Sequence, residues 1–553
     1  MNDVALHYAY EWEKSKPNEV WFVQPMGNGV VKEITYGQAM EEARRMASHL
    51  LSLNFPAKSQ IALFSKNSAW WIIADLAIWM AGHVSVPLYP TLAPHTIKQI
   101  LEHSESKLIF VGKLDGFEAM KSGIPEDMPT IALPLSPKTD YETWEGIIAK
   151  TEPLAGEVLR DPTEMATIVY TSGSTGTPKG VMLSFGKMGS CVAEVQNIIP
   201  IGKDERMLSY LPLAHVFERF LVETATLVYG FQVFFAESLD TFVVDLNRAR
   251  PTIFASVPRL WLKFQQGVFQ KMSPRVLRLL QKIPIVRGKI RQKVLTGLGL
   301  DQVRFAISGS APIPADLIDW YRGLGLELLE AYGMSENFCY SHGTKPGDVK
   351  VGYVGTVQPG VEHRLSEEGE ILVKSPGVMM GYFKQPELTE SCFTVDGFFK
   401  TGDRGEIDSG GRLRITGRVK ELFKTSKGKY VAPAPIENKL LEHNDVEMAC
   451  VSGSGQPSPY GMVVLSERAR GNVASESDRD RMASALDSLR KEINAQLDHH
   501  EQLKMLVVIG EEWTIDNGKL TPTMKLKRGA IEEESAPHVE GWYGSNKNVI
   551  WHG

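Results

Sequence analysis

The chain has 553 residues, of which 43% are hydrophobic and 23% are charged, and its formal net charge is −6. This composition is typical of a globular protein, and the length exceeds what one hydrophobic core usually serves, so we expect two or more domains. The small negative charge gives no general attraction to nucleic acid, which we exclude as a partner. The four cysteines form no CxxC pair, which argues against a zinc site or a disulfide framework and favours a reducing cytoplasm.

The first part of the chain predicts neither secretion nor a membrane span. The N-terminal residues are acidic and aromatic where a signal peptide has a basic start and an apolar block. The most apolar stretch, residues 69–89, contains Asp75, Gly82, His83 and Pro87. We predict a buried helix of about 14 residues that leads into a strand, because about 20 apolar residues are needed to cross a bilayer.

Residues 168–181, IVYTSGSTGTPKGV, join an apolar run to glycines, hydroxyl residues and a lysine. They do not form a Walker A loop, because Pro178 stands five residues after Gly173 and Gly180 follows Lys179. A flexible Ser/Gly linker is the alternative. A linker rarely follows directly on a buried strand, so the pattern favours a loop that wraps an anion.

Up to about residue 340, helical periods alternate with short apolar or β-branched runs, which predicts α/β layers with a largely parallel sheet. Four of these runs, at residues 168–170, 254–257, 305–307 and 328–331, end in loops of small or polar residues. Ligands of open α/β sheets lie at the carboxyl ends of strands. We therefore expect these four loops to converge on one ligand.

From about residue 350 the pattern changes to short strands with glycine-rich turns, which predicts a small β-barrel or sheet. The residues beyond Lys420 are more charged and include a long polar helix at about residues 475–497. This segment is expected to form a separate α+β unit.

Five motifs occur together in this chain: YTSGSTGTPKG (170–180), YGMSE (332–336), TGDRGEID (401–408), GRVKELFK (417–424) and LTPTMKLKR (520–528). In this order they resemble the adenylate-forming superfamily of acyl-CoA synthetases, luciferases and peptide-synthetase adenylation domains. The resemblance implies an N-terminal domain (1–417) of two α/β subdomains and a small β-barrel, a hinge (418–420) and a mobile α+β C-terminal domain (421–553). It also implies that a carboxylate attacks the α-phosphate of ATP, which requires dense positive charge around the phosphates.

The resemblance implies a pyrophosphate-binding loop made of Thr171, Ser172, Gly173, Ser174, Thr175, Gly176 and Lys179. It implies that Tyr332, next to Gly333, stacks on adenine, whose other face meets the backbone of Ser310, Ala311 and Pro312. Ser335 would donate to the α-phosphate and Glu336 would hold Mg²⁺. A core aromatic residue is the alternative for Tyr332, because tyrosine is common in strands.

Three further charged positions follow from the same resemblance. Asp403 would bind the ribose hydroxyls and Arg418 would close on the ribose or the phosphate, although an exposed ion pair is the alternative for both. Lys525 is similar to the lysine that reaches the α-phosphate during adenylation. The usual Ser-Gly before that lysine is Thr-Met here, and the neighbouring bases leave a solvated basic strand as the alternative.

Rotation of the C-terminal domain is implied in the same way, with Lys420 as its hinge residue. Gly428 and Lys429 would then contact CoA after adenylation is complete. A hinge must tolerate a large change in backbone angles, and the sequence alone does not test this for Lys420.

LPLAHVFER, residues 211–219, resembles the long-chain fatty acyl-CoA synthetases, and His215 would border the carboxylate pocket. A satisfied core histidine is the alternative. Some long-chain relatives have an aromatic gate near the position of Arg219, where this chain has none. The rival functions are a medium-chain or aryl-acid CoA ligase, a fatty acyl-AMP ligase that loads a carrier protein, a luciferase-type oxygenase and a nucleotide-binding scaffold.

Residues 259–300 contain ten lysines and arginines and no acid, interleaved with apolar side chains. Basic amphipathic segments of this kind are typical of helices that bind membrane surfaces. The alternative is a helix whose apolar face is core and whose charges are solvated or serve ATP or CoA. Peripheral membrane association of an otherwise cytoplasmic protein is therefore one of two interpretations.

Overall fold

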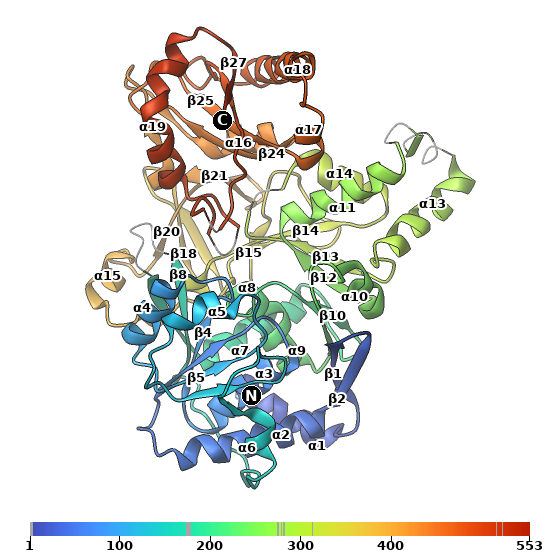
Figure 1. Cartoon of the computed structure of the whole chain (residues 1–553), viewed down its shortest axis with the longest axis vertical. Helices are drawn as coiled ribbons and strands as arrows, with labels where there is room; N and C mark the ends of the chain where they lie inside the picture. The colour runs from blue at the N-terminus through green and yellow to red at the C-terminus, as the bar shows by residue number, and fades with distance from the viewer. Residues whose placement is uncertain are drawn as a thin grey trace.

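The computed structural model describes residues 4–172, 178–273, 276–277, 279, 283–311, 313–515, 517–521 and 524–553. It has a large N-terminal part and a smaller C-terminal unit, coloured orange to red in Figure 1. Each part has its own buried apolar clusters. The mixed α/β fold confirms the class that the sequence predicts.

Two sheets form the body of the N-terminal part. The eight-stranded sheet has the order β19-β9-β8-β4-β3-β5-β6-β7, and its strands are β3 (Gln60–Phe64), β4 (Val84–Leu88), β5 (Leu108–Val111), β6 (Thr130–Ala132), β7 (Glu142–Thr143), β8 (Met165–Ser172), β9 (Pro178–Ser184) and β19 (Gly381–Tyr382). The five-stranded sheet runs from β12 to β16 and consists of β12 (Ile253–Ser256), β13 (Phe305–Ser308), β14 (Leu328–Tyr332), β15 (His342–Gly343) and β16 (Thr356–Val357).

The remaining strands form smaller sheets. One has the order β10-β11-β1-β2 and consists of β1 (Val20–Gly27), β2 (Val30–Thr35), β10 (Arg206–Ser209) and β11 (Gln232–Phe235). An antiparallel sheet follows, made of β17 (Glu362–Leu365), β18 (Glu370–Lys374), β20 (Phe399–Ile407) and β21 (Leu413–Arg418). The C-terminal unit contains β22 (Phe423–Lys424), β23 (Tyr430–Val431), β24 (Val446–Ser452), β25 (Tyr460–Leu465), β26 (Leu506–Ile509) and β27 (Val549–His552).

Helices cover these sheets and connect their strands. Those before the five-stranded sheet are α1 (Ala5–Ser15), α2 (Tyr36–Ser52), α3 (Ala69–Met80), α4 (Pro94–Ser104), α5 (Phe117–Met120), η1 (Lys121–Gly123), α6 (Trp144–Ile148), α7 (Phe185–Glu194), η2 (Val195–Asn197), α8 (Val216–Glu218), η3 (Arg219–Thr224), α9 (Ala225–Tyr229) and α10 (Phe242–Ala249). The later ones are α11 (Pro258–Lys271), α13 (Pro284–Gly297), α14 (Ala315–Gly323), η4 (Ser335–Asn337), α15 (Pro386–Ser391), η5 (Val419–Glu421), α16 (Pro433–Leu441), α17 (Glu467–Gly471), α18 (Glu476–Asn494) and α19 (Arg528–Gly544).

Helix α3 is the buried helix that the apolar stretch predicts. All 12 of its residues are buried, and the Ser68 side chain caps its first turn by accepting a hydrogen bond from the backbone N–H of Trp71. A helix that is apolar on all sides belongs inside a core, and the next element is the buried strand β4. Among the described residues, none of the helices combines the length and apolar character needed to cross a membrane.

Strands β12, β13 and β14 are parallel neighbours, so their carboxyl ends lie at one edge of the sheet. Three of the four loops expected to converge follow these strands, and the fourth follows β8 of the eight-stranded sheet. Strands β20 and β21 are among the short strands expected after residue 350, and they pair antiparallel with Asp403 opposite Arg418. The register therefore fixes the positions of these two side chains.

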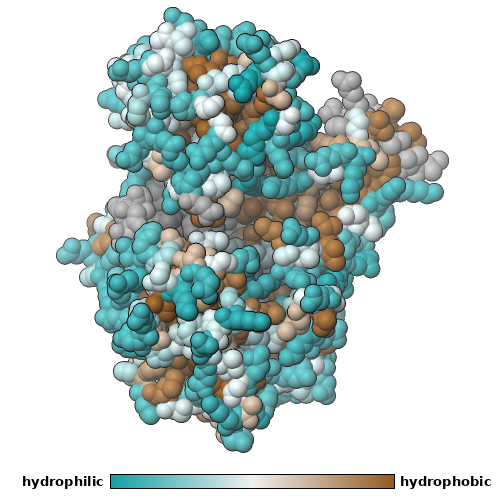
Figure 2. All heavy atoms as spheres, viewed as in Figure 1, coloured by the Kyte–Doolittle hydropathy of each residue, from teal (hydrophilic) through white to brown (hydrophobic). Residues whose placement is uncertain are grey.

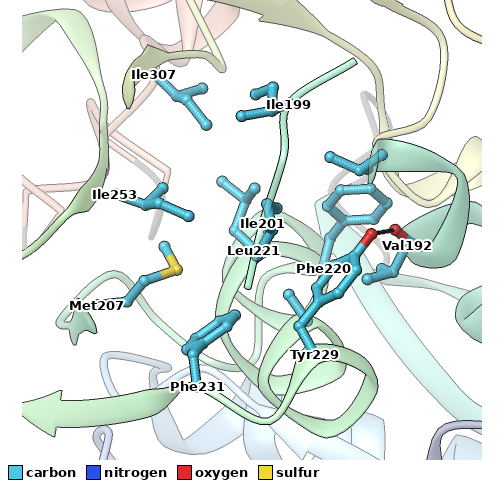
Figure 3. Close-up of a pocket in the computed structure, with 12 residues that line it drawn as sticks. Val192, Ile199, Ile201, Met207, Phe220, Leu221, Tyr229, Phe231, Ile253 and Ile307 are labelled. Carbon is cyan, nitrogen blue, oxygen red and sulfur yellow. Dashed lines mark hydrogen bonds between the residues drawn. The ribbon is translucent and has the colours of Figure 1, made fainter. Parts of the chain in front are cut away.

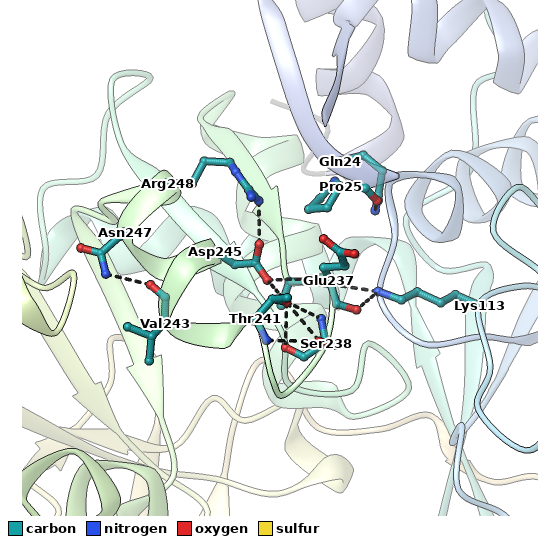
Figure 4. Close-up of polar contacts among 11 residues, drawn as sticks. Gln24, Pro25, Lys113, Glu237, Ser238, Thr241, Val243, Asp245, Asn247 and Arg248 are labelled. Atoms are coloured by element: carbon teal, nitrogen blue, oxygen red, sulfur yellow. Dashed lines mark hydrogen bonds and ion pairs between the residues drawn. The ribbon is translucent and has the colours of Figure 1, made fainter. Parts of the chain in front are cut away.

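Polar contacts join β5 to the segment after β11 (Figure 4). Lys113 donates to the carbonyl oxygens of Ala236 at 3.0 Å and Glu237 at 2.5 Å, and burial lowers its pKa. Asp245 of α10 accepts hydrogen bonds from the backbone N–H of Glu237 and the hydroxyl of Thr241, both at 2.8 Å. These bonds fix two sheets of the N-terminal part relative to each other.

Candidate active site

Tyr332, Asp403 and Arg418 form a hydrogen-bonded group where β14 meets the hairpin of β20 and β21. The Tyr332 hydroxyl donates to Asp403 Oδ2 at 2.7 Å, and Arg418 forms an ion pair with Asp403, with Nε 3.0 Å from Oδ1. Asp403 is 6% exposed, whereas the Arg418 side chain is 56% exposed. Burial and the Asp403 carboxylate raise the pKa of Tyr332, so this residue remains a neutral phenol that donates. The arrangement holds Asp403 in place and leaves Arg418 accessible.

Glu336 lies on η4, directly after the turn that follows β14. Tyr382 of β19 donates from its hydroxyl to Glu336 Oε1 at 2.7 Å. Lys179 of β9 lies 5.5 Å above the same tyrosine ring, because β19 pairs with β9. Tyr382 therefore joins two of the predicted site residues, and no spacing in the sequence identified it.

Gly333 allows the chain to turn back on itself beside Glu336. A Cβ atom at this position would lie 2.5 Å from the backbone carbon of Cys339, so every other residue would force the backbone apart. Phe338 and Cys339 adopt left-handed angles of +49° and +57°. This compact turn keeps Ser335, which is 8% exposed, and Glu336 at the end of β14.

The structure describes only some of the residues predicted to surround the phosphates and the adenine. Lys179 pairs with Thr171 across β8 and β9, and Ser310 and Ala311 are exposed directly after β13. Gly173, Ser174, Thr175 and Gly176, the Ser172 side chain and Pro312 lie outside the described residues. Because β13 neighbours β14, the backbone of residues 310–311 follows the same sheet edge as Tyr332.

His215 precedes the helical segment formed by α8, η3 and α9. Its Nδ1 accepts a hydrogen bond from the backbone N–H of Phe217 at 3.1 Å. Burial and the nearby charge of Lys525 lower its pKa to about 3. The ring is therefore neutral at physiological pH, and its proton resides on Nε2, which can donate to a substrate oxygen.

Figure 2 shows a hollow between the two parts of the molecule. Lys525 of the C-terminal unit lies close enough to Arg418, Asp403 and Glu336 for their charges to change its pKa. The pKa of Lys525 is lowered mainly by burial and secondly by the positive charge of Arg418. Part of the Lys525 surface is nevertheless exposed to solvent. Asp403 and Glu336 act in the opposite direction. Two cations that repel each other across a cleft gain stability when an anion binds between them.

Two of the neighbouring bases form ion pairs within the C-terminal unit. Lys519 forms an ion pair with Glu534, and Arg528 forms one with Glu437 at 2.8 Å. Met524 has a left-handed φ of +62°, a conformation in which glycine is favoured. The resemblance leads us to expect Ser-Gly before the lysine, and this angle gives the physical reason for the glycine.

The predicted hinge and CoA residues lie outside this group. Lys420 is exposed on the short helix η5, which directly follows Arg418. Gly428 has φ +78° in the turn between β22 and β23, and Lys429 is exposed in the same turn. Their assignment to the hinge and to CoA stays a prediction.

The N-terminal part contains an apolar pocket (Figure 3). It is lined by Val192, Val195, Ile199, Ile201, Met207, Phe220, Leu221, Ala225, Tyr229, Phe231, Ile253 and Ile307. The hydroxyl of Tyr229 donates to the carbonyl oxygen of Val192 at 2.5 Å. The pocket has a volume of about 20 Å³, enough for about one water molecule, so any larger apolar ligand must displace side chains to enter.

Phe220 lines this pocket together with Tyr229 and Phe231, whereas Arg219 does not. Arg219 is fully buried, and it pairs with Asp75 at 2.8 Å and Glu223 at 3.3 Å. Phe220 packs against Phe338, with ring centroids 5.4 Å apart. The expected aromatic position was 219, one residue before Phe220. Both residues lie in η3, a π-helix whose wider turn alters the direction of successive side chains.

Comparison with known proteins identifies the family of this chain. The family model described as AMP-binding enzyme matches residues 10–383, and the AMP-binding enzyme C-terminal domain matches residues 421–547. The chain therefore belongs to the AMP-binding enzyme family. The structure of the anthranilate CoA ligase AuaEII in complex with anthranoyl-AMP shares the fold, with a TM-score of 0.80 and 18% identity over 97% of this chain and 98% of that one.

Two curated relatives are similar over nearly the whole chain. The long-chain-fatty-acid–CoA ligase FadD15 of Mycobacterium bovis is 30% identical, over 98% of this chain and 97% of its own length. The peroxisomal long chain acyl-CoA synthetase 6 of Arabidopsis thaliana is also 30% identical, over 93% of this chain and 82% of its own length.

Proposed function

We propose that this protein is an AMP-forming acid–thiol ligase that converts a long-chain fatty acid to its acyl-CoA. The observation that carries the proposal is the 30% identity, over 98% of the chain, with a long-chain-fatty-acid–CoA ligase. The fatty carboxylate attacks the α-phosphate of ATP, and pyrophosphate leaves as acyl-AMP forms. The thiol sulfur of CoA then attacks the acyl carbonyl and loses its proton, and AMP leaves as the thioester forms.

The apolar pocket supports a fatty acyl chain as the group that is bound. Eleven of its 12 lining residues have apolar side chains, and the remaining hydroxyl, on Tyr229, already donates to the Val192 carbonyl oxygen. A polar ring substituent of an aryl acid would enter this lining at a desolvation cost. His215 begins the helical segment that carries Phe220, so we assign the carboxylate to the His215 end and the chain to the pocket.

The proposed nucleotide site is the group around Tyr332. Asp403 has its two carboxylate oxygens occupied by Tyr332 and Arg418, and it would exchange one of these bonds for the ribose hydroxyls. Tyr332 would meet adenine at the edge formed with residues 310–311. Arg418 and Lys179 supply positive charge for the phosphates.

Glu336 is the proposed magnesium ligand. Within the described part of the chain, no three His, Cys, Asp or Glu side chains cluster as a complete cage for a metal ion. One carboxylate with a fixed orientation fits Mg²⁺, which proteins usually hold through one or two carboxylates and the substrate phosphates. Such an ion would neutralise phosphate charge, and the hydrogen bond from Tyr382 fixes Glu336 for this role.

Lys525 is the proposed catalytic cation of the first half-reaction. Its ammonium group would bind the α-phosphate and the attacking carboxylate oxygen, while His215 would donate from Nε2 to the carboxylate. For the second half-reaction we propose rotation about Lys420, which would bring Gly428 and Lys429 to CoA.

The deciding experiment measures pyrophosphate release with acids from hexanoate to eicosanoate, with and without CoA. We expect release with long-chain acids and acyl-CoA only when CoA is present. Acyl-AMP that is never passed to CoA would indicate a ligase that loads a carrier protein. Preference for aryl or medium-chain acids would replace the long-chain assignment, and binding of ATP without turnover would indicate a scaffold.

We also propose that the projection formed by α11 and α13 binds an anionic membrane surface. Val276, Leu279 and Ile283 are 48%, 64% and 43% exposed near its tip, where Figures 1 and 2 show a protruding, partly apolar surface. The exposed bases around them are Lys263, Lys271, Arg287, Lys289 and Lys293. Long-chain acids partition into bilayers, so this contact would bring the enzyme to its substrate.

Other residues of the segment 259–300 do not belong to that surface. Trp261 and Phe264 are buried in the core, Arg259 forms an ion pair with Glu447, and Arg291 donates to the Gly323 carbonyl oxygen. The core interpretation of the sequence pattern therefore applies to the first half of α11. Arg275, Arg278 and Lys282 lie outside the described residues.

Co-sedimentation with vesicles of anionic or neutral phospholipid tests this second proposal. We expect binding to the anionic vesicles that falls about tenfold or more when Arg287, Lys289 and Lys293 become glutamine, because each base contributes about 1 kcal/mol near such a surface. The same change at Lys107, Lys121 and Lys138, which are exposed elsewhere, is the matched control. Equal binding of the two triple variants would contradict the proposal.

A further inference from the structure

An ion pair joins the N-terminal part to the C-terminal unit. Arg259 Nη2 of α11 donates to Glu447 Oε1 of β24 at 2.6 Å, and the two side chains are 29% and 17% exposed. The partners are 188 positions apart in sequence. The contact therefore exists only when the C-terminal unit occupies its present orientation.

The position of Arg259 is unfavourable for its own helix. It is the second residue of α11, after Pro258, and the first turn of this helix contains no acid. The N-terminus of a helix carries a partial positive charge, so a cation there lowers helix stability. Glu447 supplies the compensating negative charge from the other side of the domain boundary.

Glu447 is rigidly connected to the proposed catalytic lysine. Arg528, three residues after Lys525, donates to the carbonyl oxygen of Val451 in β24 at 2.8 Å. The same guanidinium pairs with Glu437 of α16 at 2.8 Å. Fixing Glu447 in β24 therefore fixes the segment that presents Lys525 to the cleft.

We infer that Arg259 and Glu447 are a positioning pair, which holds the C-terminal unit in the orientation that places Lys525 beside Arg418 and Asp403. The inference rests on the proposed function, because it assigns the pair to the adenylation half-reaction. The pair separates when the unit rotates for attack by CoA. Neither residue touches the substrates, and both act through the position of Lys525.

The surroundings of Glu447 allow the pair to separate readily. Arg470 of α17 lies 3.8 Å from Glu447 within the same unit, and it also pairs with Glu512 at 3.2 Å. Glu447 thus keeps a cationic neighbour after Arg259 leaves. In the described part of the chain, Nε of Arg259 is buried without a hydrogen-bond partner, and rotation would expose it to water. A partly exposed pair of this kind shifts an equilibrium by about two- to five-fold.

The experiment measures both half-reactions for wild type, Arg259→Gln, Glu447→Gln and the double variant. Acyl-AMP formation is followed by pyrophosphate release in a single turnover with palmitate and ATP. Thioester formation is followed separately from synthetic palmitoyl-AMP and CoA. Arg250→Gln is the matched control, because Arg250 pairs with Asp301 at the same distance of 2.6 Å within the N-terminal part.

Each single variant should lose about two- to five-fold in acyl-AMP formation and keep or increase the rate of thioester formation. The double variant should lose no more than either single variant, because both changes remove one interaction. The Arg250 variant should keep both rates. Equal losses in the two half-reactions, or additive losses in the double variant, would overturn the inference. Wild-type protein inactive in both would instead overturn the proposed function.

Discussion

Two groups of charged residues in this molecule differ in what surrounds them. Arg219, Asp75 and Glu223 are completely buried, whereas the Arg418 side chain of the cleft is 56% exposed. Burial raises the pKa of Glu223, which favours the neutral form of this acid. In the cleft, Lys525 and Arg418 stand close enough for the arginine to lower the lysine pKa.

The buried group around Arg219 uses its charges to hold the fold together, whereas the charges of the cleft are available to bind a ligand. In the internal group, the Arg219 guanidinium is paired with buried acids and lies over the rings of Trp71 and Trp79, at 5.1 and 6.0 Å. The cleft keeps two cations that face each other and are accessible to an anion. A buried charge needs its partner for the protein to fold, while an exposed cation remains available to bind phosphate.

The largest expected effect is on stability. Arg219→Leu leaves Asp75 buried without its guanidinium, and we expect the free energy of unfolding to fall by about 3–5 kcal/mol. Arg418→Leu should cost about 1 kcal/mol or less, because its side chain is largely solvated. Urea denaturation of both variants checks the contrast. Equal losses of stability in the two variants would show that Arg219 and Arg418 contribute equally to the stability of the fold.

The next effect is on catalysis. Lys525→Ala should slow acyl-AMP formation by about 100- to 1000-fold, as expected for loss of a group that stabilises developing charge. Transfer from synthetic acyl-AMP to CoA should remain, since that step does not use this lysine. Lys527→Ala, which removes an exposed base two residues away, is the control. A folded Lys525 variant that loses both steps equally would contradict its assignment to adenylation alone.

A third effect is the pH dependence of stability from His342, whose ring centroid lies 5.9 Å from that of Tyr332. Burial and then the neighbouring His363 lower its pKa to about 3. The unfolded chain therefore takes up the proton first, so this contribution is complete above pH 6.5 and is lost as the pH falls toward 3.

Between pH 7 and pH 5 the free energy of unfolding should decrease by up to about 2 kcal/mol through this residue. Urea denaturation at both values measures the change, and His342→Gln should reduce it. The neighbours that face the ring are Ser341, His363 and Tyr332. An unchanged pH dependence in the variant would show that His342 is not buried as a neutral ring.

The smallest effect concerns the choice of acid. Phe220→Ala should enlarge the pocket. We therefore expect kcat/KM for eicosanoate relative to laurate to rise by about tenfold, which is the range expected when a few methylene contacts change. Tyr229→Phe removes only a hydroxyl that bonds to the backbone, and it should leave the chain-length preference unchanged. An identical preference in the Phe220 variant would place the acyl chain elsewhere.

Local patterns were sufficient to predict several parts of the fold. Residues 69–89 had too few apolar positions to cross a membrane, and they form the buried helix α3 and the strand β4. The polar helix expected at about residues 475–497 is α18, which begins after the cap residue Ser475. Both depend on contacts close in sequence, which a window of residues contains.

The five motifs in their order were enough to predict the family, which the match to the AMP-binding enzyme model confirms. Three contacts could be seen only in the folded chain: Tyr382 bonds to Glu336, Arg219 pairs with Asp75 while Phe220 lines the pocket, and Arg259 pairs with Glu447. These contacts join segments between 46 and 188 residues apart. Which residues meet in these contacts depends on how the sheets and domains pack, and local spacing in the sequence does not predict it.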